Sequence, residues 1–143
     1  MITLKLMKDE KTIIWLTDNT IKNAEVASIK TDEVSWIQSV HDVELYIEVE
    51  NENLDELYAE ASEEEAEGAP PREIDSVRLL LDYSLSRYDS EKCYLDGELS
   101  IVDGFTQSVS KFELKNLFVV KFEESFTRDM KNTSIYVRLR ERV

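Results

Sequence analysis

With 143 residues, the chain has the length of one domain, and we expect a single core formed by residues 1–143. A formal net charge of -14 opposes contact with nucleic-acid phosphates and anionic lipid headgroups, so we expect neither as a partner. One cysteine, one histidine and three glycines supply no structural zinc site, catalytic triad or phosphate-binding loop. We therefore expect no cofactor, no metal and no enzymatic activity.

Alternation of apolar and polar residues predicts strands in the first third of the chain. Residues 2–6 and 12–16 form the first two, with a short connection from Lys8 to Lys11, and another begins at 34–36. The clearest pattern covers residues 43–49, where every second side chain is aliphatic: Val43, Leu45, Ile47 and Val49. Such a strand has one face in the core and one face in water.

The pattern at residues 53–62 predicts one short helix, because Asn53 can cap it and Leu54, Leu57 and Ala61 share a face. An acidic stretch with glycine and two prolines follows, and we interpret residues 62–73 as a mobile surface loop. Its acidic side chains are candidate partner contacts: Glu63, Glu64, Glu65 and Glu67.

Residues 77–85 also alternate, and we interpret them as a strand, although a helix through Ile74, Val77, Leu81 and Leu85 fits the same residues. A further strand covers 93–101, where Gly97 indicates a bulge or a close backbone approach. An Asp103-Gly104 turn separates it from a strand beginning at Val109 and continuing to about residue 122, with Asn116 interrupting its apolar side.

The last predicted strand covers residues 135–139. About eight strands at regular spacing indicate a mostly β fold, an antiparallel sandwich or small barrel with one short helix. Within it, Trp15, Trp36 and Cys93 are predicted to pack in the core, and His41 is interpreted as a solvated loop residue.

Charge is uneven along the chain. Residues 41–70 contain many acids and neither lysine nor arginine, whereas the C-terminal end is basic and offers candidate partner contacts at Arg138, Arg140 and Arg142. This pattern predicts a molecule that is polar from end to end, which would suit head-to-tail self-association. The plainer alternative is that the acidic charge provides solubility alone.

Three segments, in order, resemble the haemolysin-coregulated (Hcp) tube protein of type VI secretion. The alternating strand 43–49 followed by the helix resembles the family's strand and single helix, residues 111–126 resemble its long Lys-x-Leu-x-Phe strand, and residues 133–140 resemble its last strand. The longer link from Glu63 to Asp103 departs from the family. The resemblance implies a non-enzymatic protein that forms a hexameric ring and stacks into a tube, as in contractile phage tails.

A second class of function stays open, namely an acidic inhibitor such as a toxin-immunity, anti-defence or nucleic-acid-mimic protein. Residues 42–67 would then cover a basic site on the target. Both classes act by binding protein, as a homo-oligomer in the first case. The N-terminus lacks a signal-peptide pattern and no apolar run spans a bilayer, so we expect a cytoplasmic protein or part of a secreted or virion assembly.

Overall fold

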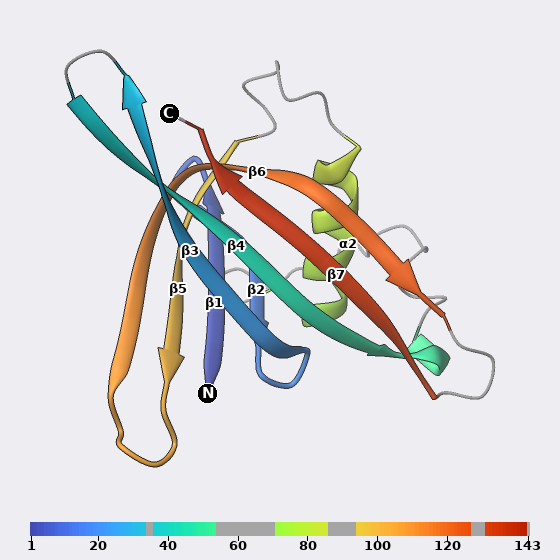
Figure 1. Cartoon of the computed structure of the whole chain (residues 1–143). Helices are drawn as coiled ribbons and strands as arrows, with labels where there is room; N and C mark the ends of the chain where they lie inside the picture. The colour runs from blue at the N-terminus through green and yellow to red at the C-terminus, as the bar shows by residue number, and fades with distance from the viewer. Residues whose placement is uncertain (34–35, 54–70, 86–93, 127–130, 143) are drawn as a thin grey trace.

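The computed structural model describes residues 1–33, 36–53, 71–85, 94–126 and 131–142. Seven antiparallel strands in these residues form one sheet in the order β2-β1-β5-β6-β7-β4-β3 (Figure 1). Their bounds are β1 Ile2–Lys8, β2 Lys11–Thr17, β3 Ile21–Glu33, β4 Trp36–Glu50, β5 Leu95–Val102, β6 Val109–Ser125 and β7 Asn132–Glu141. The 3-10 turn η1 (Asn51–Asn53) and the helix α2 (Glu73–Ser84) complete the described elements. The prediction of a mostly β antiparallel fold is confirmed.

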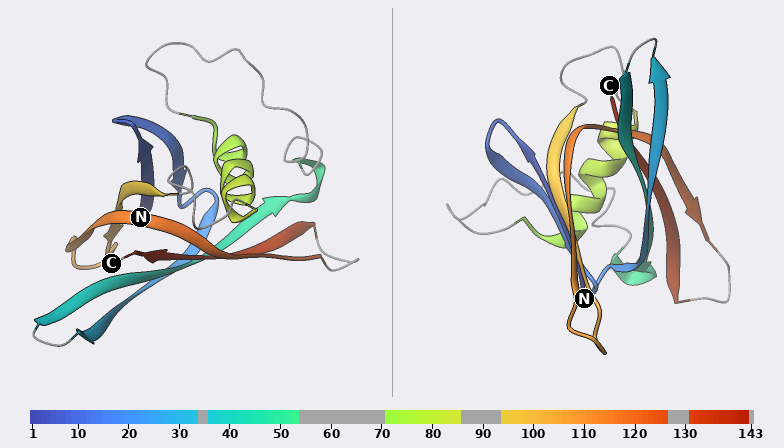
Figure 2. Two further views of the ribbon diagram at one scale, coloured as in Figure 1. Left: turned by 90° about the horizontal axis from the view of Figure 1, so that it is seen from above. Right: turned by 60° about the vertical axis from the view of Figure 1, so that its left-hand side comes forward.

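The long strand β6 divides the sheet into two halves of four strands each, because it belongs to both. Residues 109–117 of β6 pair with β5, whereas residues 117–125 pair with β7 on the opposite side. We call β2-β1-β5-β6 the first half-sheet and β6-β7-β4-β3 the second half-sheet. The two halves lie at an angle to one another and the sheet does not close (Figure 2).

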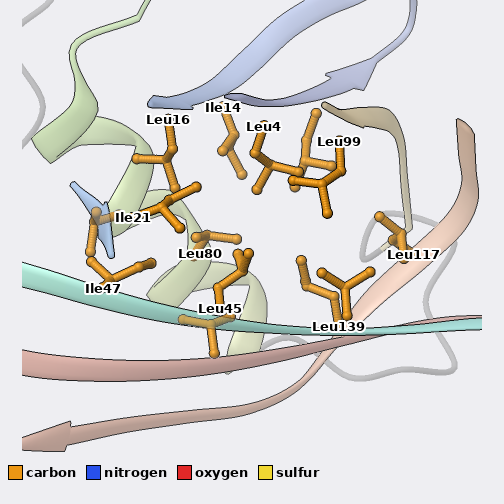
Figure 3. Close-up of a cluster of buried hydrophobic side chains, with 14 of the residues drawn as sticks. Leu4, Ile14, Leu16, Ile21, Leu45, Ile47, Leu80, Leu99, Leu117 and Leu139 are labelled. Atoms are coloured by element: carbon orange, nitrogen blue, oxygen red, sulfur yellow. The ribbon is translucent and has the colours of Figure 1, made fainter. Parts of the chain in front are cut away.

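The core lies between the half-sheets. Figure 3 shows Leu4, Ile14, Leu16 and Leu99 of the first half-sheet facing Leu45, Ile47 and Leu139 of the second, with Leu80 of α2 among them. All of these side chains are at most 1% exposed. The alternating residues predicted for 2–6, 12–16, 43–49 and 135–139 supply most of this core, as the period of two requires.

Residues 73–84 form a helix, so our interpretation of 77–85 as a strand is wrong. The helix buries Ser76, Val77 and Leu80, which are spaced as one helical face, and contacts β2 and β6. Glu73 and Asp75 lie in its first turn, where carboxylates are favourable. Arg72 at its N-cap forms an ion pair with Asp75, and Glu73 begins the helix, so the predicted loop 62–73 ends earlier than expected.

Tight turns and irregular positions lie where the sequence indicated them. Asp9 and Glu10 connect β1 to β2 with positive φ angles of 51° and 65°. At Gly97 the β5–β6 register shifts, and the Lys5 carbonyl passes close to the glycine, so both predicted readings hold. Asn116 has a φ of 51° and lies in a bulge of β6, which continues through it instead of ending there.

Several expectations concern residues outside the described ranges: the helix at 53–62 beyond Asn53, most of the loop 62–73, residues 34–35 and the side chains of Trp36 and Cys93. Trp15 is half-buried on β2, in partial agreement with core packing. None of the helices in the described residues is long and apolar enough to cross a bilayer.

Candidate protein-interaction surface

The outer edge of β2 is covered by side chains of α2. Ser76 Oγ accepts a hydrogen bond from the Trp15 amide at 2.9 Å, and Glu73 Oε1 accepts one from the Thr17 amide at 2.6 Å. Glu73 also accepts a bond from the Thr17 hydroxyl at 2.8 Å. The helix therefore satisfies donors that would otherwise offer this edge to another strand.

A second cap lies where β7 ends and its neighbours β4 and β6 separate. Glu141 Oε1 accepts hydrogen bonds from the His41 amide at 2.6 Å and from His41 Nδ1 at 2.5 Å, while Oε2 accepts one from the Lys115 amide at 2.8 Å. Because a carboxylate only accepts, Nδ1 must carry the hydrogen. His41 thus lies in β4 against Glu141 and Phe112, and its interpretation as a solvated loop residue is wrong.

The second half-sheet has two margins that no such side-chain cap covers among the described residues, although α2 also contacts β6. In that part of the chain β3 pairs only with β4, and residues 118–123 of β6 pair only with β7. These are the two opposite margins of the second half-sheet (Figure 1). The Ala24 amide on β3 is satisfied locally by the side chain of Asn23, at 2.9 Å. We call these margins the β3 edge and the β6 edge.

Asp42 organises the basic residues of β7. This carboxylate is 5% exposed and accepts bonds from Arg138 at 2.6–3.2 Å and from Arg140 at 3.0 Å. Hydrogen bonds from Arg138 hold the pKa of Asp42 below its usual value; burial opposes this effect and Arg140 adds to it. Acidic β4 and basic β7 are therefore neighbours, and in the described residues the predicted separation of charge from end to end is wrong.

Charge is instead separated across the second half-sheet. Lys121 of β6 pairs with Arg138 of β7, Arg138 with Glu44 of β4, and Glu44 with Glu25 of β3. Directly opposed residues share a face, so these four side chains form one row, which we call the charge row. It has two positive residues on the β6 side and two negative residues on the β3 side.

An aromatic pair lies beside the charge row. Tyr46 and Tyr136 oppose each other on β4 and β7, with ring centroids 5.4 Å apart, and the Tyr136 hydroxyl donates to Glu44 at 2.7 Å. That hydrogen bond raises the pKa of Tyr136 to about 12. Partial burial and then the charges of Glu25 and Glu44 raise the pKa of Tyr46. Around Tyr46 the face is acidic and aromatic, whereas Arg138 and Lys121 make the β6 side of it basic; tyrosine is enriched at protein–protein interfaces.

The β5–β6 connection presents one fully exposed aromatic side chain, Phe105. Asp103 Oδ1 accepts bonds from the Phe105 and Thr106 amides at 2.8 and 3.3 Å, and the Gln107 amide donates to the Asp103 carbonyl at 3.0 Å. Those amide bonds lower the pKa of Asp103. The ring is thus held in water by an ordered turn, and burying it against another protein would remove apolar surface from water.

A hollow with a volume of about 530 Å³ lies at η1. The described residues that line it are Glu50, Asn51, Glu52, Lys131 and Asn132. A hydrogen bond with Glu50 raises the pKa of Glu52. No group of three or more side chains that could hold a metal ion occurs in the described residues.

The residues predicted as partner contacts differ in what they bind in the structure. Arg138 and Arg140 hold Asp42, and Arg142 donates to the Tyr94 hydroxyl at 2.7 Å and stacks on its ring. Glu63, Glu64, Glu65 and Glu67 lie outside the described residues. The β3 edge was missed altogether, because residues 21–33 are mostly polar and their only strand signal is the short alternation at Ala24 and Val26.

No family model matches the chain, and no curated protein matches it. Among solved structures, the chain is similar to one described as the structure of Hcp1 from Flavobacterium johnsoniae. The match has a TM-score of 0.48 and 9% sequence identity, and it covers 98% of this chain and 90% of that one.

Proposed function

We propose that this chain is a non-enzymatic structural subunit that assembles with copies of itself into a ring or tube, as part of a phage-tail-like or type VI injection machine. The observation that carries the proposal is the second half-sheet, which ends in the β3 edge and the β6 edge while β2 is capped. Uncovered strand edges are sites of strand pairing between chains. The residue patterns that resemble the Hcp family agree with this role.

The two edges differ, and this determines the kind of assembly. Pairing of one edge with the other is heterologous, so each added copy leaves a fresh edge for the next. If the rotation between copies closes, the product is a ring; if it does not, the product is a helical filament. The caps from Ser76 and Glu73 of α2 disfavour growth at the β2 edge.

Light scattering at low and high salt, with negative-stain imaging of the same sample, tests the proposal. We expect rings or stacked tubes whose mass varies little with salt, since the contact depends on backbone bonds and apolar burial. Ser28 offers an edge-blocking variant, because it is exposed and belongs to the residues of β3 whose amides face away from β4. Ser28→Pro should give monomers, whereas Ser28→Ala should assemble normally. A wild-type protein that stays monomeric at all concentrations would contradict the proposal.

The acidic and aromatic face around Tyr46 favours a second candidate, an inhibitor that binds a basic partner. Glu25 and Glu44 oppose each other there as like charges, which a cationic partner would relieve. Binding should then weaken steeply with salt. Replacement of Glu63, Glu64, Glu65 and Glu67 by glutamine should abolish partner binding under this candidate and leave the mass of the assembly unchanged under the first.

A further inference from the structure

We infer that the β3 edge of one copy adds to the β6 edge of a second copy as an antiparallel pair in which Ala24 lies opposite Phe122 and Glu25 opposite Lys121. The inference rests on the proposed self-assembly and names its contact. The partner is a second copy because the two edges match each other in hydrogen-bonding direction, in face and in charge.

The hydrogen-bonding direction of β3 follows from its pairing with β4. The Glu48 amide donates to the Thr20 carbonyl, so the even-numbered residues of β4 direct their backbone groups toward β3. These residues oppose Asn23, Glu25 and Ala27, which therefore point back toward β4. The backbone groups of Ala24 and Val26 consequently point outward at the β3 edge.

The pairing of β6 with β7 gives the hydrogen-bonding direction at the β6 edge in the same way. The Arg142 amide donates to the Asn116 carbonyl, so the even-numbered residues of β7 point toward β6. They oppose Lys121 and Glu123, which leaves the backbone of Phe122 directed outward. Ala24 opposite Phe122 is thus a pair that can exchange two hydrogen bonds, at the expense of the local bond between the Ala24 amide and Asn23.

The faces of the two edges also agree. Ala24 opposes the core residue Leu45, and Phe122 opposes the core residue Val137, so both side chains lie on the core side of the sheet. Glu25 and Lys121 lie in the charge row on the outer side. The inferred register therefore continues the apolar face and the outer face of one copy into those of the next.

Charge favours this register over the two registers that are shifted by two residues. Within one copy the charge row places Lys121 beside Arg138 and Glu25 beside Glu44, and each like-charged pair is unfavourable. Joining the edges sets Glu25 against Lys121, so the negative end of one row meets the positive end of the next. Sliding by two residues would oppose Glu25 to Glu123 in one direction and to Val119 in the other, and neither pair is favourable.

Cysteine cross-linking tests the register directly in full-length protein with Cys93 replaced by serine. Glu25 and Lys121 would form a non-hydrogen-bonded pair, whose Cα atoms lie about 4.5 Å apart, close enough for a disulfide. Chains carrying Glu25→Cys and Lys121→Cys should give a ladder of oxidised oligomers on a denaturing gel. The control pair Glu25→Cys and Glu123→Cys, one register step away, should give little.

Mixing the single variants distinguishes this contact from a two-fold one. Glu25→Cys protein mixed with Lys121→Cys protein should form cross-linked dimers, whereas either variant alone should not. Dimers from Glu25→Cys alone would overturn the inference, because they require β3 to pair with itself. Equal or absent ladders from the two double variants, in protein that scattering shows to be assembled, would overturn the register and leave the proposed function standing. Monomers throughout would overturn both.

Charge reversal adds a readout that a purely structural role would not produce. Glu25→Lys relieves the like-charged contact with Glu44 and should leave the fold at least as stable, yet it should weaken association about tenfold. Lys121→Glu relieves the like-charged contact with Arg138 and should weaken association by the same amount, but it also removes the exposed ion pair of Lys121 with Glu123 at 3.4 Å, so it should not stabilise the fold. The double reversal should restore association. Reversals that leave association unchanged would contradict the inference.

Discussion

Replacement of Gly97 by alanine should destabilise the protein strongly, because β1 leaves no room for a side chain there. A Cβ atom on Gly97 would lie 2.2 Å from the Lys5 carbonyl oxygen and 2.5 Å from Leu6 Cδ2, whereas such contacts are essentially never shorter than 3.0 Å. The leucine tip can rotate away, but the carbonyl belongs to the β1–β5 ladder. Relief therefore requires β1 and β5 to separate, which costs overpacking strain and about one or two backbone hydrogen bonds, or about 2–4 kcal/mol in total.

Urea unfolding followed by circular dichroism measures this change, and a loss of about 3 kcal/mol corresponds to a fall in Tm of roughly 10 °C for a domain of this size. Gly104→Ala is the matched control, because a Cβ there meets no atom within 4 Å. We expect that variant to unfold within about 0.5 kcal/mol of wild type. A Gly97→Ala protein as stable as Gly104→Ala would refute the argument that β1 and β5 approach too closely for a side chain.

Three further predictions concern polar contacts. Asp42→Asn should reduce the unfolding free energy at neutral pH by about 1–3 kcal/mol. Because the pKa of Asp42 is lowered in the folded protein, the difference from wild type should shrink as pH falls below about 4. Denaturation curves at several pH values would show this trend. Ser76→Ala should cost about 1–2 kcal/mol in thermal unfolding by leaving the β2 amide without its acceptor, whereas Ser84→Ala should cost less. Glu141→Ala should speed amide hydrogen exchange at His41 and Lys115 by roughly tenfold, and unchanged protection would show that the carboxylate is not what shields them.

Much of the fold was predictable because its strands follow the simple period of two. Where Leu45 and its neighbours alternate with charged residues, only a half-buried strand satisfies both kinds of side chain. The segment of α2 shows the limit of that reasoning. Val77 and Leu80 lie three residues apart as in a helix, but the surrounding leucines also alternate, and tertiary contact with β2 decides between the readings.

The candidate interaction surface was less accessible to sequence reasoning because it depends on pairing between distant segments. Glu25 and Lys121 are unremarkable in sequence, and only the order β6-β7-β4-β3 places them at opposite ends of one row. The same pairing brings Asp42 to Arg138, so the charge imbalance along the chain is not a charge imbalance in space. Local patterns carry information about faces, and they carry none about which strands are neighbours.

Because β6 belongs to both half-sheets, it constrains the order in which they can form during synthesis. β1 pairs with β5, where Ile2 opposes Ile101, and β4 pairs with β7, where Asp42 opposes Arg140. When the first fifty residues have left the ribosome, only the β1–β2 and β3–β4 hairpins can form, and isolated hairpins are marginal in water. Both half-sheets must wait for β6, and the second must also wait for β7 at the end of the chain. We therefore expect slow folding and a nascent chain whose β4 needs protection from aggregation until β7 has been synthesised.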